Sequence, residues 1–273
     1  MADQETAGAA APNVVAALTA DGAELDAMIV GLDEAGWRTP TPAPGWTVAH
    51  QVAHLAATFK LAGLAAADPD TFQAVTSRLS PDFNANVDAA LAGYLADPPP
   101  VLLSRWQEEK AFAEKALGAI PGDRIVPWLV RPLPASVLAC AGMMELFGHG
   151  QDIADALGVR RTFTDRIRFL VGFAVRTWDF GYQARGLETP DAQLRFELTA
   201  PSGARWTFGP ADSDQVVSGS AADFCLLVTR RRHVDDLDLS ATGEVARHWL
   251  TIAQAYRGPA GEGRAPGQFA AHA

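Results

Sequence analysis

Hydrophobic residues recur at helical spacing through the first two-thirds of the chain. Apolar side chains three and four positions apart place one apolar stripe on each segment. Stretches rich in proline and glycine interrupt the pattern, such as TPTPAPG at residues 39–45 and DPPP at 97–100. The predicted helices cover residues 14–32, 46–67, 101–117, 135–157 and 164–182, with part of 72–95 also helical. Residues 125–134 contain too many prolines for a helix and are expected to be extended.

Near residue 190 the helical period gives way to alternation. Residues 193–199 alternate apolar and polar side chains, which is typical of a half-buried strand, and Pro201-Ser202-Gly203 indicates a hairpin turn. We expect strands over 193–199, 205–208 and 215–218 in a small antiparallel sheet, and short helices over 221–229 and 244–256. The remaining segment, GPAGEGRAPGQFAAHA, predicts a loose tail. An all-helical part is therefore followed by a smaller mixed part.

Composition and charge narrow the class of protein. The chain has 273 residues, 48% hydrophobic and 20% charged, with a formal net charge of −10. This acidic balance argues against binding to nucleic acid, which requires a basic surface. No apolar stretch is long enough to span a membrane, and the acidic N-terminus does not resemble a secretory signal. The two cysteines, Cys140 and Cys225, are too few for a disulfide framework, so we expect a cytoplasmic protein.

Ionisable residues on two of the predicted helices indicate a metal site. His50 and His54 lie one helical turn apart, and Glu145 and His149 have the same separation on another helix. Imidazole and carboxylate groups from facing helices can bind a first-row divalent metal, most often zinc, although ferrous iron also fits two histidines and one carboxylate. The alternatives are that Glu145 and His149 form a surface pair, or that a histidine on an apolar helix is a core residue with its hydrogen bonds satisfied. The apolar neighbours of His54 and Glu145 favour a metal, because buried ionisable groups need a partner.

Two motifs surround these candidate ligands: PGWTV at residues 44–48 with VAHL at 52–55, and ELFGHGQDI at 145–153 with ALG at 156–158. They resemble the motifs of the DinB-like, mycothiol-dependent maleylpyruvate isomerase family. The resemblance covers nearly the whole chain and implies an N-terminal DinB-like four-helix bundle that holds zinc. It also implies a smaller C-terminal α/β domain like the sterol carrier proteins. The ligands that it implies are His54, Glu145 and His149.

The composition break near residue 190 agrees with such a division. We expect a metal-binding bundle over 1–187, a small α/β domain over 188–257 and a flexible tail over 258–273.

Further site residues follow from the resemblance and from their positions. His50 is expected to line the pocket or to hydrogen-bond a ligand, and Asp152 to orient an imidazole. A basic residue of the C-terminal domain is implied to face the metal. The candidates are Arg230, Arg231 and Arg232. The alternatives are a solvated acid at residue 152, and arginines that complement the end of a helix and pair with acids at residues 235 and 236.

Three functions fit these residues. The first is a zinc enzyme that uses a small thiol, such as mycothiol, for isomerisation or S-transfer on an electrophilic small molecule. The second is a thiol-independent enzyme in which the metal acts as a Lewis acid for hydrolysis, cyclisation or rearrangement. The third is a non-catalytic, metal-stabilised protein that binds a small molecule. We expect a monomer or homodimer in each case.

Overall fold

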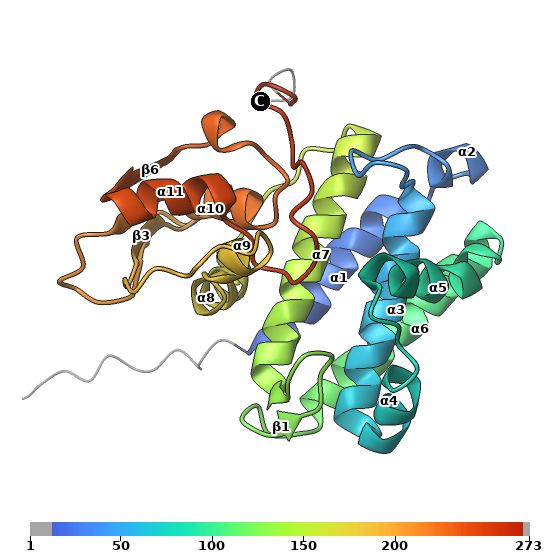
Figure 1. Cartoon of the computed structure of the whole chain (residues 1–273). Helices are drawn as coiled ribbons and strands as arrows, with labels where there is room; N and C mark the ends of the chain where they lie inside the picture. Colours follow the sequence, from blue (N-terminus) through green and yellow to red (C-terminus); the bar gives the residue numbers. More distant parts are fainter. Residues whose placement is uncertain (1–12, 270–273) are drawn as a thin grey trace, which may run out of the picture.

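The computed structural model describes residues 13–269 as a helical bundle packed against a smaller part that contains a β-sheet (Figure 1). Four long helices form the bundle: α1 (Val14–Ile29), α3 (Val48–Ala67), α6 (Pro99–Gly118) and α7 (Ala135–Leu157). Short helices connect them: α2 (Glu34–Trp37), α4 (Pro69–Thr76) and α5 (Phe83–Leu95). The predicted DinB-like bundle is confirmed. None of the helices in residues 13–269 has the length and apolar character needed to cross a membrane.

Local sequence signals set the ends of these helices. The side chain of Asn13 accepts hydrogen bonds from the first turn of α1, and Asp68 caps α4 just before Pro69. Gly158 ends α7 in the left-handed conformation, with φ of 66°, which glycine adopts without strain. Helix α3 packs against both α6 and α7. Trp106 of α6 is fully buried, with its ring against Phe59 of α3 and its indole nitrogen donating to Asp26 of α1.

The segment between α6 and α7 is extended, as the sequence predicts. It contains two very short strands, β1 (Ile125–Val126) and β2 (Leu133–Pro134), which pair in antiparallel fashion. The loop between them, residues 127–132, lies at one end of the bundle beside the start of α7 (Figure 1).

The smaller part is built on a four-stranded sheet in the order β4-β3-β5-β6. Its strands are β3 (Arg195–Thr199), β4 (Arg205–Phe208), β5 (Val216–Ser220) and β6 (Leu239–Thr242). The predicted hairpin of β3 and β4 is confirmed, but β3 and β5 are parallel, so the expectation of a purely antiparallel sheet is wrong. The reason is that residues 209–215 carry the chain from β4 to the far side of β3.

Helices α10 (Ala221–Val228) and α11 (Glu244–Ile252) pack on this sheet. Their aromatic residues Phe224 and Trp249 meet Phe196 of β3 in a cluster whose members are almost fully buried. Helix α11 ends earlier than the predicted residue 256, because the following backbone extends and Ala255 donates a hydrogen bond to the carbonyl of Val228.

The predicted helix over residues 164–182 is interrupted. It consists of a 3₁₀ turn (Asp165–Ile167), α8 (Arg168–Arg176) and α9 (Phe180–Gln183). The interruption leaves the carbonyl of Trp178 free to accept a hydrogen bond from the indole of Trp249, at 2.7 Å. A tertiary contact therefore replaces helical bonding at this point.

The segment predicted as a tail makes polar contacts in its described part, which runs to residue 269. Arg264 forms an ion pair with Asp152 of α7, and Gly267 donates to the carboxylate of Asp236. The segment passes alongside α7 in Figure 1. Polar contacts of this kind leave no apolar pattern in a sequence, so composition could not reveal them. Residues 270–273 lie outside the described part of the chain.

Candidate metal centre

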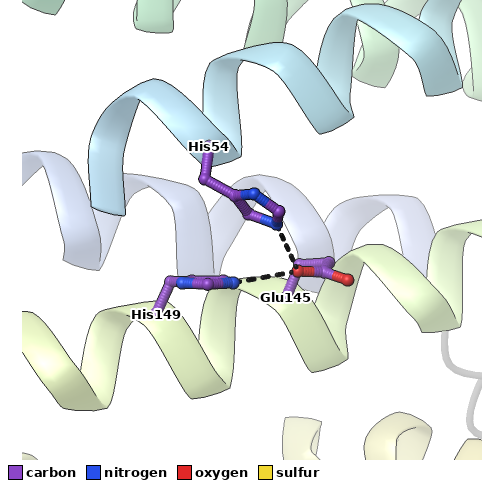
Figure 2. A group of neighbouring side chains, drawn as sticks. All are labelled: His54, Glu145 and His149. Carbon is purple, nitrogen blue, oxygen red and sulfur yellow. Dashed lines mark ion pairs between the residues drawn. The ribbon is translucent and has the colours of Figure 1, made fainter. Parts of the chain in front are cut away.

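Side chains from α3 and α7 form a compact cluster of possible metal ligands. His54 of α3 meets Glu145 and His149 of α7, and one ligand atom from each lies within 4.8 Å of the others. The Nε2 atoms of His54 and His149 lie 3.4 and 3.2 Å from the same oxygen, Oε2 of Glu145 (Figure 2). The structure thus brings together the three residues that the sequence nominated. Two imidazole nitrogens and one carboxylate oxygen make a donor set suited to zinc or another first-row divalent ion.

Burial governs the charges of this cluster. Burial, aided by the nearby His54, lowers the pKa of His149 to about 4, so its ring is neutral at pH 7. Burial alone would raise the pKa of Glu145, but the adjacent imidazoles of His149 and His54 hold it well below its usual range. At neutral pH the carboxylate is therefore ionised.

Gln51, one turn before His54 on α3, fixes the orientation of His149. Its amide nitrogen donates to the hydroxyl of Thr41 at 2.9 Å and faces Asp152 at 3.5 Å, so its carbonyl oxygen is turned toward His149. Nδ1 of His149 donates to that oxygen at 2.5 Å. The other ring nitrogen then presents a lone pair to the carboxylate of Glu145. Two electron-rich atoms 3.2 Å apart repel each other unless a cation lies between them, so these residues fit a metal ion.

Trp46 adds an aromatic wall beside the two histidines. Its ring stacks on His149, with ring centroids 6.0 Å apart and planes inclined by 19°, and it lies 5.5 Å from the ring of His54. The wall restricts the side from which a ligand can approach the cluster.

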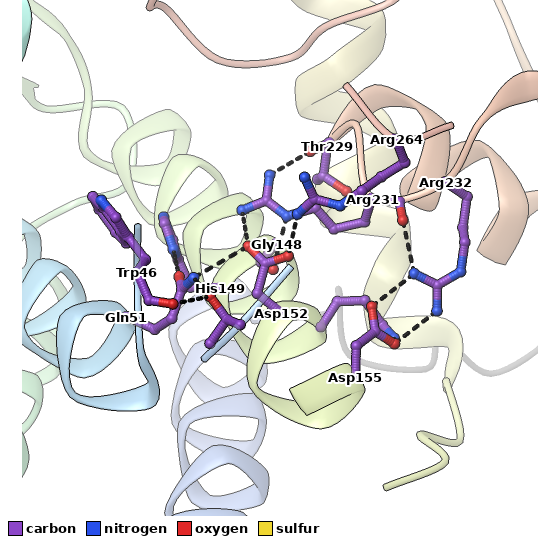
Figure 3. A network of polar contacts seen from close by, with 12 residues as sticks. Trp46, Gln51, Gly148, His149, Asp152, Asp155, Thr229, Arg231, Arg232 and Arg264 are labelled. Atoms are coloured by element: carbon purple, nitrogen blue, oxygen red, sulfur yellow. Dashed lines mark hydrogen bonds and ion pairs between the residues drawn. The ribbon is translucent and has the colours of Figure 1, made fainter. Parts of the chain in front are cut away.

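Asp152 connects the cluster to the C-terminal part of the chain. This residue is fully buried, and its two carboxylate oxygens pair with Arg231 at 2.8 Å and with Arg264 at 2.6 Å (Figure 3). Arg231 also donates from Nε to the carbonyl of Gly148 on α7, at 3.1 Å. A side chain at Gly148 would lie 3.3 Å from this guanidinium group, so the glycine permits the close approach. Asp152 also lies 3.5 Å from the amide nitrogen of Gln51, whose oxygen contacts His149, so this acid is buried in a polar network beside the cluster and is not solvated.

The remaining candidates take other positions. Arg232 pairs with Asp155, and Arg230 reaches the carbonyl of Gly261 in the C-terminal segment. His50 is hydrogen-bonded through Nδ1 to the hydroxyl of Thr47 at the start of α3. Neither Arg230 nor His50 lines the cavity over the cluster. Within residues 13–269, the ion pairs of the arginines reach acids of α7 rather than residues 235 and 236.

A large cavity opens over the three possible ligands. Its volume is about 1300 Å³, above the range of roughly 300–1,000 Å³ that is usual for small-molecule sites. Both parts of the molecule contribute to the wall: α3, α7 and the β1–β2 loop from one part, and Arg231, the end of α8 and residues 256–258 from the other. The cluster is therefore accessible to a ligand that contacts both parts.

Comparisons with known proteins identify the family. Residues 18–154, half of the chain, match the family model described as mycothiol maleylpyruvate isomerase N-terminal domain. The chain belongs to this family. Residues 190–242 match a second family model, described as wyosine base formation.

The chain is similar to two uncharacterised proteins and to an enzyme of known structure. Two uncharacterised proteins of Mycobacterium tuberculosis, from strains CDC 1551 / Oshkosh and H37Rv, are each 42% identical over 250 residues, covering 92% of this chain and 97% of theirs. A crystal structure of the mycothiol-dependent maleylpyruvate isomerase superposes with a TM-score of 0.53 at 20% identity, covering 78% of this chain and 86% of that one. A histidine-to-alanine mutant of the isomerase gives the same TM-score at 19% identity. At this identity the likeness shows the shared fold.

The sequence analysis assigned no role to three residues that lie around the cluster. Gln51 lies on the same helical face as His54 and next to His50, but a glutamine carries no motif-level signal. Trp46 was part of the quoted motif without a role. Arg264 lies in the segment predicted to be loose, 112 residues from its partner Asp152.

Proposed function

We propose that the chain is a zinc-dependent enzyme that uses a small-molecule thiol, mycothiol or a close analogue. The thiol would add to an electrophilic substrate and either leave again after isomerisation or stay attached as the product of S-transfer. The observation that carries this proposal is the cluster of His54, Glu145 and His149 under a cavity lined by both parts of a member of the isomerase family. The isomerase with a solved structure is named for its dependence on mycothiol.

The chain's own residues would divide the work. His54, Glu145 and His149 would hold the metal, with Gln51 and Asp152 keeping His149 in the tautomer whose Nε2 can coordinate. A bound divalent ion would supply positive charge that favours ionisation of a thiol near it. Trp46 would exclude water from one side of the reacting groups.

Arg231 is the residue of the C-terminal part that is best placed to orient a substrate. Its guanidinium is fixed by Asp152 and by the carbonyl of Gly148, and it lines the cavity. A planar, permanently charged donor held in this way suits an anionic group or a polarised carbonyl of the substrate. Arg230 and His50, which the sequence also nominated, would support the fold around the site.

The remaining properties follow from the proposed chemistry. Zinc is our first choice of metal, with ferrous iron as the alternative for the same donor set. A reducing compartment such as the cytoplasm suits both a thiol co-substrate and the two free cysteines, Cys140 and Cys225. The partners are a small-molecule substrate and the thiol, and the cavity is complete within one chain, so a monomer or a homodimer would serve.

The test is a screen of electrophiles on zinc-loaded protein, with and without mycothiol, alongside elemental analysis. We expect turnover that requires both zinc and thiol, and we expect His54→Ala and His149→Ala to lose both metal and turnover. Turnover with metal but without thiol would replace the proposal by Lewis-acid chemistry. Saturable binding without turnover would favour a binding protein, and full metal retention in both variants would remove the metal site.

A further inference from the structure

The cavity extends well beyond the metal cluster into an apolar section. Toward the β1–β2 loop its wall includes Leu61 and Ala62 of α3, Leu138 and Ala141 of α7, and Trp128. Polar side chains line the cavity on the side of α4 and α5, among them Gln73 and Asn84. The side chains toward the loop offer no hydrogen bonds along the section, apart from the indole nitrogen of Trp128. The section therefore fits a hydrocarbon or aromatic body better than a sugar or a small polar acid.

The charged side chains of the cavity wall are strongly biased toward arginine. Its acids are Glu145 and Asp152, of which the first belongs to the metal cluster and the second is paired with two arginines. Its arginines are Arg131, Arg176, Arg231 and Arg257. The whole chain carries a net charge of −10, so average composition does not account for this excess. The cavity attracts anions although the protein as a whole repels them.

Two of these arginines, Arg176 and Arg257, line the cavity and are also exposed to solvent. Arg176 lies in the last turn of α8, and the next residue, Thr177, donates to the carbonyl of Ala255, two positions before Arg257. The guanidinium of Arg257 rests 4.5 Å from the ring centroid of Phe180, at the start of α9. Neither arginine forms an ion pair within the described part of the chain, residues 13–269.

Arg176 and the metal cluster face the same cavity. Helix α8 packs against α7, and Arg176 in the last turn of α8 lines the cavity together with Ala141 and Glu145 of α7. One ligand in this cavity can therefore contact both the cluster and Arg176.

We propose that this cavity binds an organic anion whose apolar body fills the apolar section toward the β1–β2 loop and whose carboxylate or phosphate contacts Arg176 and Arg257. The inference names the substrate class for the function proposed above and rests on it as regards the reaction. Binding itself requires only the cavity and the two arginines.

The experiment measures binding rather than turnover, by calorimetry and by the fluorescence of Trp46 and Trp128, which line the cavity. The probes are butyrate, octanoate, dodecanoate, octyl phosphate and octanol, on metal-free and on zinc-loaded protein. We expect affinity for the acids to rise with chain length, by up to about fourfold per methylene group. Octanoate should bind at least about tenfold more tightly than octanol, because only the acid forms charge-assisted hydrogen bonds. Comparing the affinities for octyl phosphate and octanoate shows whether the site prefers a phosphate or a carboxylate.

Three variants test the assigned residues. The double change Arg176→Ala and Arg257→Ala should reduce the affinity for octanoate to that for octanol, without loss of thermal stability. Arg247→Ala, an exposed arginine of α11 outside the cavity, is the matched control and should change nothing. Ala141→Phe should weaken the binding of dodecanoate and leave the affinity for butyrate unchanged, because the larger side chain fills the apolar section.

The inference is overturned if wild-type protein binds octanoate and octanol equally, or if the double variant keeps the preference for the acid. Loss of length dependence would overturn the assignment of the apolar section. Anion binding without thiol-dependent turnover would count against the proposed function alone, so the two failures are distinguishable.

Discussion

At the scale of single residues, the neighbours of the metal cluster determine how it can work. Gln51 is fully buried, and its amide nitrogen is already committed to Thr41 and Asp152. Its carbonyl oxygen is thereby directed at Nδ1 of His149. Because one ring nitrogen is fixed as a donor, the other is fixed as a ligand.

Gln51→Leu should lower the affinity for zinc by roughly 10–100-fold, the usual cost of losing a residue that orients a ligand. The change keeps a side chain of similar length but removes the acceptor for His149. Zinc titration against a competing chelator measures the effect, and unchanged affinity would show that Gln51 does not orient the histidine.

His50→Ala is the matched control, one position away on α3. His50 contacts Thr47 at the start of the helix and does not line the cavity. We expect unchanged zinc affinity and a loss of about 1 kcal/mol in the free energy of unfolding, as for other contacts at helix starts. A large loss of zinc affinity in this variant would show that His50 does belong to the metal site.

The two cysteines should be unreactive. Burial raises the pKa of Cys140 to about 11 and that of Cys225 well above its usual value. At pH 8 only about one Cys140 in a thousand is then a thiolate, and the fraction grows as the pH approaches 11. Slow alkylation at pH 8 by iodoacetamide, followed by mass spectrometry, and normal turnover in Cys140→Ser and Cys225→Ser would confirm that the reacting thiol is not the protein's own. Rapid labelling of Cys140 would contradict this.

Single residues also differ in how far the sequence alone reveals their part in the site. His54, Glu145 and His149 stand out because their side chains are rare on apolar helix faces and their spacing puts two of them on one turn. Gln51 and Arg264 do not stand out. Their roles depend on contacts between α3, α7 and the C-terminal segment, which no local pattern encodes.

At the scale of elements, the C-terminal segment is the main departure from expectation. Helices α1, α3 and α7 carry continuous apolar stripes and clear ends, so their positions follow from sequence. Residues 258–269 have no stripe and are held by single polar contacts. Among these, the ion pair of Arg264 with Asp152 is buried, with 9% and 0% of the side chains exposed.

Arg264→Ala should therefore destabilise the protein by about 1–3 kcal/mol, because Asp152 keeps Arg231 but loses its second partner. Thermal and urea unfolding measure the loss. Arg230→Ala is the control: it removes only an exposed contact to Gly261 in the same segment and should change the free energy of unfolding by less than about 0.5 kcal/mol. If both variants are as stable as wild type, the segment is not anchored as described.

At the scale of the whole molecule, α7 belongs to two hydrophobic cores. Leu146 lies in the core of the bundle, whereas the adjacent Phe147 lies in the second core with Phe163 and the buried residues of α8. The second core thus begins on α7 itself, with Met144 and Phe147, while Leu146 and Ile153 of the same helix belong to the first. The buried residues of α8 join the core of the sheet part, although α8 is helical like the bundle.

A helix shared by two cores should make them unfold together. Leu146→Ala and Phe147→Ala alter neighbouring residues that face different cores, and each should cost about 3–5 kcal/mol through the cavity that it leaves. We expect calorimetry to show one transition, shifted down in both variants, with equal calorimetric and van't Hoff enthalpies. Two transitions, each moved by only one of the variants, would instead mean that the bundle and the sheet part are stable separately. The metal cluster and Arg231 lie in different parts. In that case folding alone would not fix their relative positions, and a bound substrate would have to bring them together.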